Sequence, residues 1–362
     1  MRAVRLPIRT LSAQPPWDAS EPLECVAVVP EAPDVVTFSF RAPSGAWFDY
    51  LPGQFVTLAL PLPGGTVHRT YTLSSSPSRP LSVSITVKAQ PGSAGSRWMI
   101  DTLRPGMRLD AHGPAGLFSF QQHPADKYLL ISAGSGITPM MSMIGSMFDH
   151  GEAADVALIA CARTPAQIVF RRRLELMASR LPSLKLHFVV AADDPFEVWT
   201  GYRGHFNPLM LGLMAPDYLE REVFCCGPEG FMQSVRETLV SLGHDSARYH
   251  QESFHAPIET PADAPPLDDV VPREDAMAEI LFTESAVTAT CNETDTVLAV
   301  ARSAGLGIPS GCTFGVCGTC KVRKLAGEVH MVHSGGISDD DVAAGYILAC
   351  CSQPLGKVEI AV

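Results

Sequence analysis

Four cysteines near the C-terminus have the spacing of a site for iron–sulfur chemistry. Cys312, Cys317 and Cys320 follow one another as C-x4-C-x2-C, and Cys350 comes thirty residues after the third. Plant-type [2Fe–2S] clusters are held by four thiolates at this spacing. Three glycines keep the short loop free of bulk, so that its backbone amides can point at the sulfides. The sequence therefore predicts a one-electron redox centre with these four cysteines as metal ligands.

Two alternatives bear on this site. A structural zinc ion also binds clustered thiolates, but zinc usually takes paired C-x2–4-C knuckles, and only one short pair occurs here. Cys351 adjoins Cys350, and neighbouring residues on a strand point to opposite faces, so only one of the two can be a ligand. Cys350 lies four residues before Pro354, as in ferredoxins, and we take it as the ligand. Cys351 is then a small buried hydrophobic residue.

A run of basic, aromatic and hydroxyl residues upstream suits a phosphorylated aromatic cofactor. The run is Arg69-Thr70-Tyr71-Thr72-Leu73-Ser74-Ser75-Ser76-Pro77. An arginine with closely spaced hydroxyls can bind a phosphate, and an aromatic ring can pack on a flat one. Farther on, the glycine-rich turn at 91–96 leads into a helical stretch that ends at Leu103, and free amides at a helix start bind anions. Two phosphate-suited elements in one segment favour a dinucleotide flavin.

A second nucleotide-binding pattern follows a buried strand. The strand at 128–131 precedes Gly134-Ser135-Gly136-Ile137-Thr138-Pro139 and a methionine-rich helix. Strand, glycine turn and helix in this order bind phosphates in α/β sheets. Arginines at 163 and 171–173 follow the next strand. They could recognise a 2′-phosphate or form a solvated helix face.

The elements that must position these residues change in character along the chain. Short alternating strands punctuated by Pro-Gly pairs fill 21–122 and predict a small closed β-barrel. Buried strands alternate with helical stretches over 123–256, which predicts a parallel sheet with helices on both faces. In this second segment Cys161 and Cys225 are expected to be plainly buried, as are Cys25 and Cys291 elsewhere.

A linker separates this part from a small third domain at 277–362. Residues 257–276 contain five prolines and carry a net charge of −5, so they should be extended and semi-stiff. Residues 1–20 are expected to be a loose N-terminal arm. Of the 362 residues, 46% are hydrophobic, which is enough for real cores, and the net charge of −11 argues against nucleic-acid binding. The most apolar stretch, 128–148, is interrupted by glycines and a proline, so no membrane span is expected.

These motifs together resemble the ferredoxin–NADP reductase superfamily, through R-x-Y-[ST]-x-x-S, a G-x-x-S helix start, G-x-G-I-T-P, C-G-P and a final Glu-x-aromatic. The resemblance implies a multidomain α+β and α/β protein. Its parts are an antiparallel Greek-key flavin-binding β-barrel, a parallel α/β nicotinamide-binding domain and a C-terminal β-grasp ferredoxin domain. The sequence departs from the family pattern at Ser93, where a glycine is usual.

The resemblance also implies roles for single residues. Thr72 would lie near the flavin N5, Cys226 beside the nicotinamide C4, and Phe254 over the flavin face, while Glu252 would order the site; these four are the catalytic candidates. The remaining cofactor-binding candidates are Arg69, Thr70, Tyr71, Thr86, Val87, Lys88, Ala94, Gly95, Ser96, Gly134, Gly136, Thr138, Pro139, Gly227 and Pro228. The run S-S-S-P resembles the FAD-binding branch.

The order of the parts predicts an electron-transfer enzyme. A nicotinamide releases two electrons together and a [2Fe–2S] cluster takes one, so a flavin between them would split the pair. Over residues 20–362 the chain resembles the reductase components of glycine betaine and related quaternary-ammonium Rieske monooxygenases. That resemblance implies a cytoplasmic reductase carrying electrons from NADH, with NADPH the less favoured donor, through FAD and the cluster to a terminal oxygenase or another one-electron acceptor. The alternatives are the NADH reductase of the hybrid-cluster protein and a non-enzymatic, redox-sensing iron–sulfur module.

Overall fold

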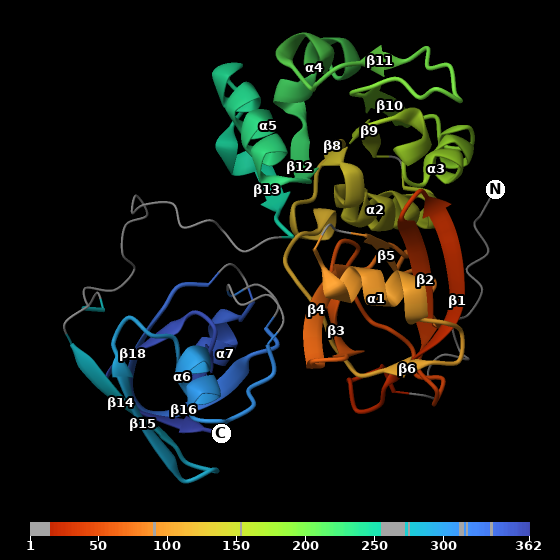
Figure 1. Cartoon of the computed structure of the whole chain (residues 1–362). Coiled ribbons are helices and arrows are strands. Elements are labelled where there is room, and N and C mark those ends of the chain that lie inside the picture. The colour runs from red at the N-terminus through yellow and green to blue at the C-terminus, as the bar shows by residue number, and fades with distance from the viewer. Residues whose placement is uncertain are drawn as a thin grey trace. The chain divides into compact units, whose positions relative to one another are not determined.

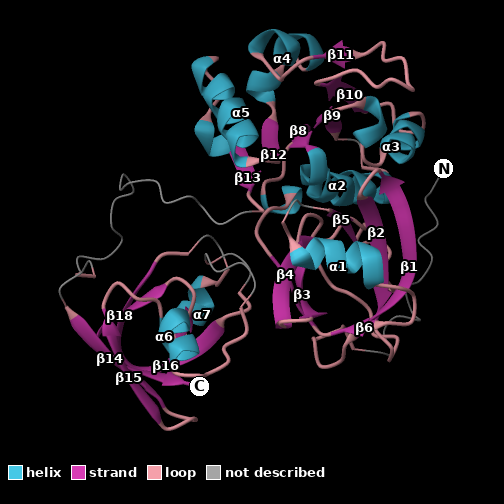
Figure 2. Cartoon of the chain, viewed as in Figure 1, coloured by secondary structure: helices cyan, strands magenta, loops and turns pink. Residues whose placement is uncertain are grey.

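The computed structural model describes residues 15–89, 92–152, 154–254, 272–273, 276–310, 315, 318–333 and 336–362. Its helices and strands are shown in Figures 1 and 2. The chain divides into two compact units, which are treated separately below. The first contains residues 1–54, 62–64 and 71–254, and the second contains 55–61, 65–70 and 255–362. The predicted arm at 1–20 is described only from residue 15, and the predicted linker only at 272–273 and 276.

Short antiparallel strands fill the N-terminal third, as the alternating pattern predicts. Four of them form a sheet in the order β5-β2-β1-β6, and three form a sheet in the order β4-β3-β7. Alternate residues of β2, such as Phe38 and Phe40, are buried in the core. The elements are β1 (Leu23–Ala32), β2 (Val35–Arg41), β3 (Phe55–Leu62), β4 (Gly65–Thr72), β5 (Val83–Lys88), α1 (Ala94–Thr102), β6 (Arg108–Leu109), β7 (Ala111–Ala115) and the 3-10 turn η2 (Phe120–Gln122).

A six-stranded parallel sheet follows, in the order β11-β10-β9-β8-β12-β13. Alternate residues of its strands enter separate hydrophobic clusters, as expected of a sheet covered on both faces. The strands are β8 (Lys127–Ala133), β9 (Asp155–Ala162), β10 (Leu184–Val190), β11 (Tyr202–Arg203), β12 (Glu222–Cys226) and β13 (Tyr249–Glu252). The helices are α2 (Ile137–His150), α3 (Arg171–Ala178), α4 (Pro208–Met214) and α5 (Glu229–Ser241), with 3-10 turns η3 (Gly134–Gly136), η4 (Pro165–Gln167), η5 (Tyr218–Glu220) and η6 (Ser246–Arg248).

The order of this sheet reverses at β8. The chain runs from β8 outward through β9 and β10, and then returns to place β12 on the other side of β8. In open α/β sheets, ligands bind at the carboxyl ends of the strands where the order reverses. The loops after β8 and β12 are therefore the expected ligand-binding edge.

The C-terminal part is a five-stranded mixed sheet in the order β15-β14-β18-β16-β17, with α6 packed into its core. This is the β-grasp arrangement expected from the sequence. Its elements are β14 (Met277–Phe282), β15 (Val287–Asn292), α6 (Val297–Ser303), β16 (Lys321–Met331), α7 (Asp339–Ala343), β17 (Tyr346–Leu348) and β18 (Ser352–Ala361). Within the described residues of the chain, no helix is long and apolar enough to cross a membrane.

Candidate functional site

Three polar side chains line up across the carboxyl ends of neighbouring strands. Ser132 of β8 is in register with Cys226 of β12, and Cys226 is in register with Glu252 of β13. Residues in register on adjacent strands point to the same face of a sheet. All three are nearly or completely buried. The structure thus brings Cys226 and Glu252 together, as the predicted site requires, and adds Ser132, which the motifs did not indicate.

Thr72 joins this row from the end of β4. Its hydroxyl donates to Oε2 of Glu252 over 3.3 Å, and both side chains are buried. Burial raises the pKa of Glu252 to about 8, although the hydrogen bond from Thr72 opposes the rise. The carboxyl is therefore largely protonated at neutral pH, where it can donate a proton or a hydrogen bond.

Cys226 is a neutral thiol in this site. Burial raises its pKa well above the ordinary value, and the neighbouring Glu252 raises it further. A thiol held neutral is a poor nucleophile. Cys226 is accordingly suited to packing against a bound ring and unsuited to covalent chemistry.

One polar atom in the row has no partner in the structure. The Ser132 hydroxyl is buried and makes no hydrogen bond. Buried polar groups are almost always satisfied, so an orphaned hydroxyl beside a buried thiol and carboxyl fits a site that receives a polar group from a ligand. The row therefore fits a cofactor that presents a hydrogen-bonding group to Ser132.

Two glycines let the loops of this edge approach each other closely. A Cβ on Gly136 would lie 2.0 Å from the carbonyl oxygen of Cys226. A Cβ on Gly227 would lie 2.9 Å from the Phe231 ring and 3.1 Å from the Cβ of Ala133. A side chain is sterically excluded at Gly136, and at Gly227 the Phe231 ring and Ala133 would have to shift to admit one. The G-x-G and C-G-P motifs thus have a packing reason that is independent of any resemblance.

A cavity of about 510 Å³ opens beside these loops. Of the predicted site residues, Lys88, Gly134 and Pro228 line it. Its volume is within the usual range for small-molecule sites, and it lies at the reversal of strand order, so it fits a nucleotide. Residues lining it that the motifs missed come from the loops after β9, β10 and β11 and from α5, and they include Gln167, His205, Phe206, Phe231 and Ser234.

Several predicted residues shape the turns around the cavity. The Thr138 hydroxyl donates to the Ser135 carbonyl over 3.0 Å, and Pro139 is buried in the first turn of α2. Cys161, expected to be plainly buried, is instead partly exposed and lines the cavity. The expectation was wrong because Cys161 stands at the carboxyl end of β9, where the strand opens to the ligand-binding edge. Cys25, Cys225 and Cys291 are buried as expected.

A buried chain of hydroxyls lies in the barrel, near the run at 69–77 that is predicted to bind the flavin. Thr86 lies 2.8 Å from both Thr37 and Ser74, Oγ to Oγ. Val87 next to it is buried, and Tyr71 is half-buried. Arg69 is exposed and donates to the carbonyl of His68, while Thr70 lies 3.2 Å from Thr57 through their hydroxyls.

The start of α1 explains the departure at Ser93. Ser93 is the N-cap of the helix, and its hydroxyl accepts from the Ser96 amide over 3.5 Å. A serine can therefore replace the usual glycine because it caps the helix itself. Ala94 is exposed, whereas Gly95 and Ser96 are buried.

Hydrogen bonds hold the loop after β4 against α2, which fixes Thr72 at the strand end. Ser142 of α2 donates to the Ser75 carbonyl over 2.7 Å. Asp149 accepts two hydrogen bonds from Arg79, of 2.6 and 3.0 Å. Burial alone would raise the pKa of Asp149, but the bonds from Arg79 and Ser78 lower it, so the carboxylate stays charged at neutral pH.

The iron–sulfur site is described in part. Cys312 and Cys317 lie outside the described residues, whereas Cys320 and Cys350 are buried and close together. The Cys350 amide donates to the Cys320 sulfur over 3.4 Å, a bond typical around cluster thiolates. Cys351, expected to be buried, is partly exposed and bonds the Leu348 carbonyl at 3.7 Å. This geometry supports Cys350 as the ligand.

Phe254 is placed at the end of the first unit's described residues. Its side chain is 40% exposed, two residues after the buried Glu252. A large exposed aromatic residue beside a buried polar row is consistent with a ring that is covered only when a ligand is present. Its role as a flavin cover remains a prediction.

Comparisons with known proteins identify the families of the three parts of the chain. Residues 24–120 match the oxidoreductase FAD-binding domain family, residues 130–237 the oxidoreductase NAD-binding domain family, and residues 282–355 the 2Fe-2S iron-sulfur cluster binding domain family. The stachydrine N-demethylase reductase subunit of Rhizobium meliloti is 62% identical, over 95% of this chain and 97% of that protein. The glycine betaine monooxygenase reductase subunit of Pseudomonas aeruginosa is 47% identical, over 93% and 94%.

Phthalate dioxygenase reductase is a similar solved structure. It is 25% identical, with a TM-score of 0.58 over 94% of this chain and 97% of that one. The fold and the site together define a flavin- and nicotinamide-dependent oxidoreductase that carries its own iron–sulfur domain. The chain belongs to the family of monooxygenase reductase subunits that includes the two relatives above. The resemblance predicted from the motifs is thereby confirmed.

Proposed function

We propose that the protein is the reductase subunit of a Rieske-type monooxygenase that demethylates glycine betaine or a related quaternary ammonium compound. The observation that carries the proposal is the 62% identity with a stachydrine N-demethylase reductase subunit, which extends over 95% of the chain. Family membership also favours the enzyme over the non-enzymatic, redox-sensing module considered from the sequence. Membership of this group of reductase subunits also supports the cytoplasmic location expected from the sequence.

The chain's residues divide the work along the electron path. A bound FAD would supply the ability to take two electrons and release them singly. The missing side chains at Gly136 and Gly227 let the loops after β8 and β12 pack closely at the strand ends, where a nicotinamide would bind. The row of Ser132, Cys226 and Glu252 is buried there. Glu252 and Thr72 would hold a proton beside the bound cofactors at this edge. Cys320 and Cys350 would hold the cluster with Cys312 and Cys317.

NADH is the proposed electron donor. Recognition of a 2′-phosphate needs unpaired cations at the adenosine end of the cavity. Arg171 is paired with Glu175 and Glu197, and its guanidinium lies 5.1 Å from the Trp199 ring centroid. Arg203 is paired with Asp193. Of the arginines at 163 and 171–173, Arg163 lines the cavity, so its contact with the coenzyme is what the comparison of donors below tests.

The donor is tested by comparing kcat/KM for NADH and NADPH with ferricyanide as acceptor. We expect NADH to be favoured by at least about tenfold, equivalent to about 1.4 kcal/mol. Replacing Arg163 with Gln should change the two values by similar factors, because the adenosine ribose is common to both. A preference of the wild type for NADPH contradicts the proposed donor.

The electron order is tested at the cluster. In Cys317→Ser, reduction of cytochrome c by NADH should disappear while ferricyanide reduction by the flavin survives. Persistence of cytochrome c reduction in this variant shows that electrons bypass the cluster.

The substrate class is tested by adding the co-purifying oxygenase of the native host and measuring formaldehyde release from glycine betaine and stachydrine. If formaldehyde is released from neither compound while cytochrome c is still reduced, the proposed substrate class is wrong. The assignment of the protein as a reductase then still holds.

A further inference from the structure

A second group of polar side chains lies upstream of the buried row, at the start of β12 and two residues before Glu252 on β13. Glu222 is the first residue of β12, and His250 is the second residue of β13. Four residues farther along β12, or about 13 Å at the rise of a strand, stands Cys226. The two groups share one face of the sheet, and Phe224 separates them, with its ring centroid 4.9 Å from that of His250.

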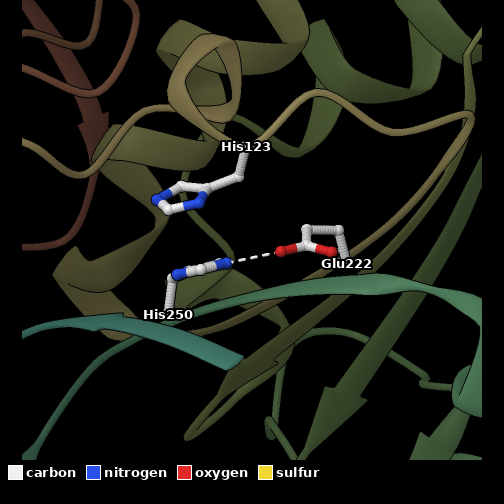
Figure 3. A group of neighbouring side chains, drawn as sticks. All are labelled: His123, Glu222 and His250. Atoms are coloured by element: carbon white, nitrogen blue, oxygen red, sulfur yellow. Dashed lines mark hydrogen bonds and ion pairs between the residues drawn. The ribbon is translucent and has the colours of Figure 1, made fainter. Parts of the chain in front are cut away.

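His123 comes to this group from the connection between the barrel and the parallel sheet. It follows η2 and precedes β8, and its ring stacks on that of His250 with the centroids 3.6 Å apart and the planes at 23°. Figure 3 shows the two imidazoles facing each other, with the Glu222 carboxylate at their side. Nε2 of His250 donates a hydrogen bond of 2.6 Å to Oε1 of Glu222. One ligand atom from each of His123, Glu222 and His250 lies within 4.8 Å of the others.

We propose that His123, Glu222 and His250 form a binding site for a divalent transition metal of the zinc class, separate from the cofactor sites. Two imidazoles and one carboxylate are an established zinc ligand set with a fourth position left for water. Each of the three side chains is partly buried, so water can reach that position. A tetrahedral zinc spaces its ligand atoms by about 3.3 Å. The 2.6 Å bond would therefore lengthen, and the His123 ring would turn toward the other two.

Neighbouring groups already hold Glu222 and the backbone of His123 in place. Arg248 donates to the second oxygen of Glu222 over 3.2 Å and also bonds the carbonyls of Leu219 and Glu220, which leaves Oε1 directed at the histidines. The Tyr128 hydroxyl donates to the His123 carbonyl over 3.3 Å and accepts from the Ala125 amide over 2.7 Å. Such outer-shell bonds hold ligands at metal sites and keep the cost of rearrangement low.

Metal binding here would clamp the barrel-to-sheet connection onto the sheet edge. His123 belongs to that connection, whereas Glu222 and His250 belong to strands β12 and β13. The carboxyl ends of the same strands present Cys226 and Glu252. The proposed ion therefore stabilises the strands that position the buried row of Ser132, Cys226 and Glu252. It takes no part in the electron path.

The test uses the holoenzyme with FAD and cluster in place. The protein is equilibrated with zinc chloride, passed over a chelating resin and analysed for zinc, with iron as the internal count of loaded protein. We expect about one zinc per chain in the wild type and a loss of at least tenfold in affinity for His123→Ala and Glu222→Gln. His150→Gln is the matched control, because His150 lies 4.0 Å from Glu152 without a second histidine partner in the described structure. Equal zinc retention by the wild type and His123→Ala, or none by the wild type, overturns the proposal.

A spectroscopic measurement on the wild type gives a readout that does not depend on how the variants fold. Oxidised FAD and an oxidised [2Fe–2S] cluster are diamagnetic, so Cu²⁺ added in one equivalent is observed alone by electron paramagnetic resonance. The wild type should show nitrogen splitting from two imidazoles, and His123→Ala should show splitting from one. A copper signal without imidazole splitting in the wild type contradicts the site. The outcome is independent of the proposed acceptor and substrate.

Discussion

Glu252 is the residue whose environment has the clearest measurable consequence. Its pKa is raised to about 8 by burial, so the folded protein keeps a proton that the unfolded chain loses near pH 4.5. The folded state binds more protons between these values, and stability therefore falls as pH rises from about 4.5 to about 8. Glu252→Gln carries no charge at any pH and should lack this loss.

The prediction can be measured as the free energy of unfolding in urea, for the wild type and Glu252→Gln at two pH values. At 1.36 kcal/mol per pKa unit, Glu252→Gln should gain on the order of 3 kcal/mol over the wild type between pH 5.5 and pH 8.5. Glu237→Gln on the exposed face of α5 serves as the control and should gain nothing. A stability difference between Glu252→Gln and the wild type that does not change with pH shows that the carboxyl is already ionised in the folded protein.

The two adjacent cysteines give a paired prediction. Cys350→Ser should abolish the visible absorbance of the cluster and lower the iron content, since Cys350 is placed beside the Cys320 sulfur. Cys351→Ser should retain both, because the Cys351 sulfur bonds the Leu348 carbonyl instead. Iron analysis and absorbance of the two purified variants decide the question. Loss of iron in Cys351→Ser with retention in Cys350→Ser reverses the assignment.

At the scale of elements, the turn between β8 and α2 is constrained by backbone packing. Gly136→Ala would place a Cβ 2.0 Å from the Cys226 carbonyl oxygen, so β12 or the turn must move. We expect the dissociation constant for NADH to rise by at least about a hundredfold, or about 2.7 kcal/mol. Fluorescence titration of the oxidised protein measures it.

The matched control for this change lies on α4. Gly212 is inside that helix, and a Cβ there meets nothing within 4 Å. Gly212→Ala should leave NADH binding unchanged and add up to about 1 kcal/mol of stability, because alanine favours a helix interior. Tight NADH binding by Gly136→Ala contradicts the packing argument.

Elements also show how far the sequence can be interpreted. Periodicity and turn residues predicted the barrel strands, the parallel sheet and its glycine turns, and the motifs predicted the meeting of Thr72, Cys226 and Glu252. Ser132 and the cavity residues on the outer loops could not be predicted. Their participation depends on which strands become neighbours, and β8 pairs with β12 across some ninety residues of chain. The partial exposure of Cys161 was missed for the same reason.

A motif comparison also does not reveal the structural role of a single residue that departs from the motif. Ser93 looked like a defect in a glycine turn, and it is a helix cap. The histidine–glutamate group has no signature in the sequence, because His123, Glu222 and His250 come from three separate segments. Spacing identifies a site when one loop supplies most of its ligands, as for the cysteines. It fails when tertiary packing assembles them.

At the scale of the whole molecule, charge predicts how the acceptor docks. Residues 277–362 hold nine acidic and five basic residues, a net charge of −4. A basic patch on the acceptor would complement this domain and accelerate encounter. The second-order rate of electron transfer should therefore fall by about tenfold or more between 50 and 500 mM salt, while NADH–ferricyanide turnover changes little. A rate to the acceptor that is independent of salt contradicts electrostatic docking.

The contact between Gly136 and the Cys226 carbonyl bears on protein engineering. It indicates that coenzyme choice and hydride-transfer geometry depend on different parts of the cavity. At the reactive edge the turn at Gly136 is held against the Cys226 main chain, so that position cannot accept a side chain unless the backbone moves. The far end of the cavity is formed by side chains on loops after β9 and β10, such as Arg163. Coenzyme choice can accordingly be retargeted from the adenosine side, by changes that leave the hydride-transfer geometry as it is.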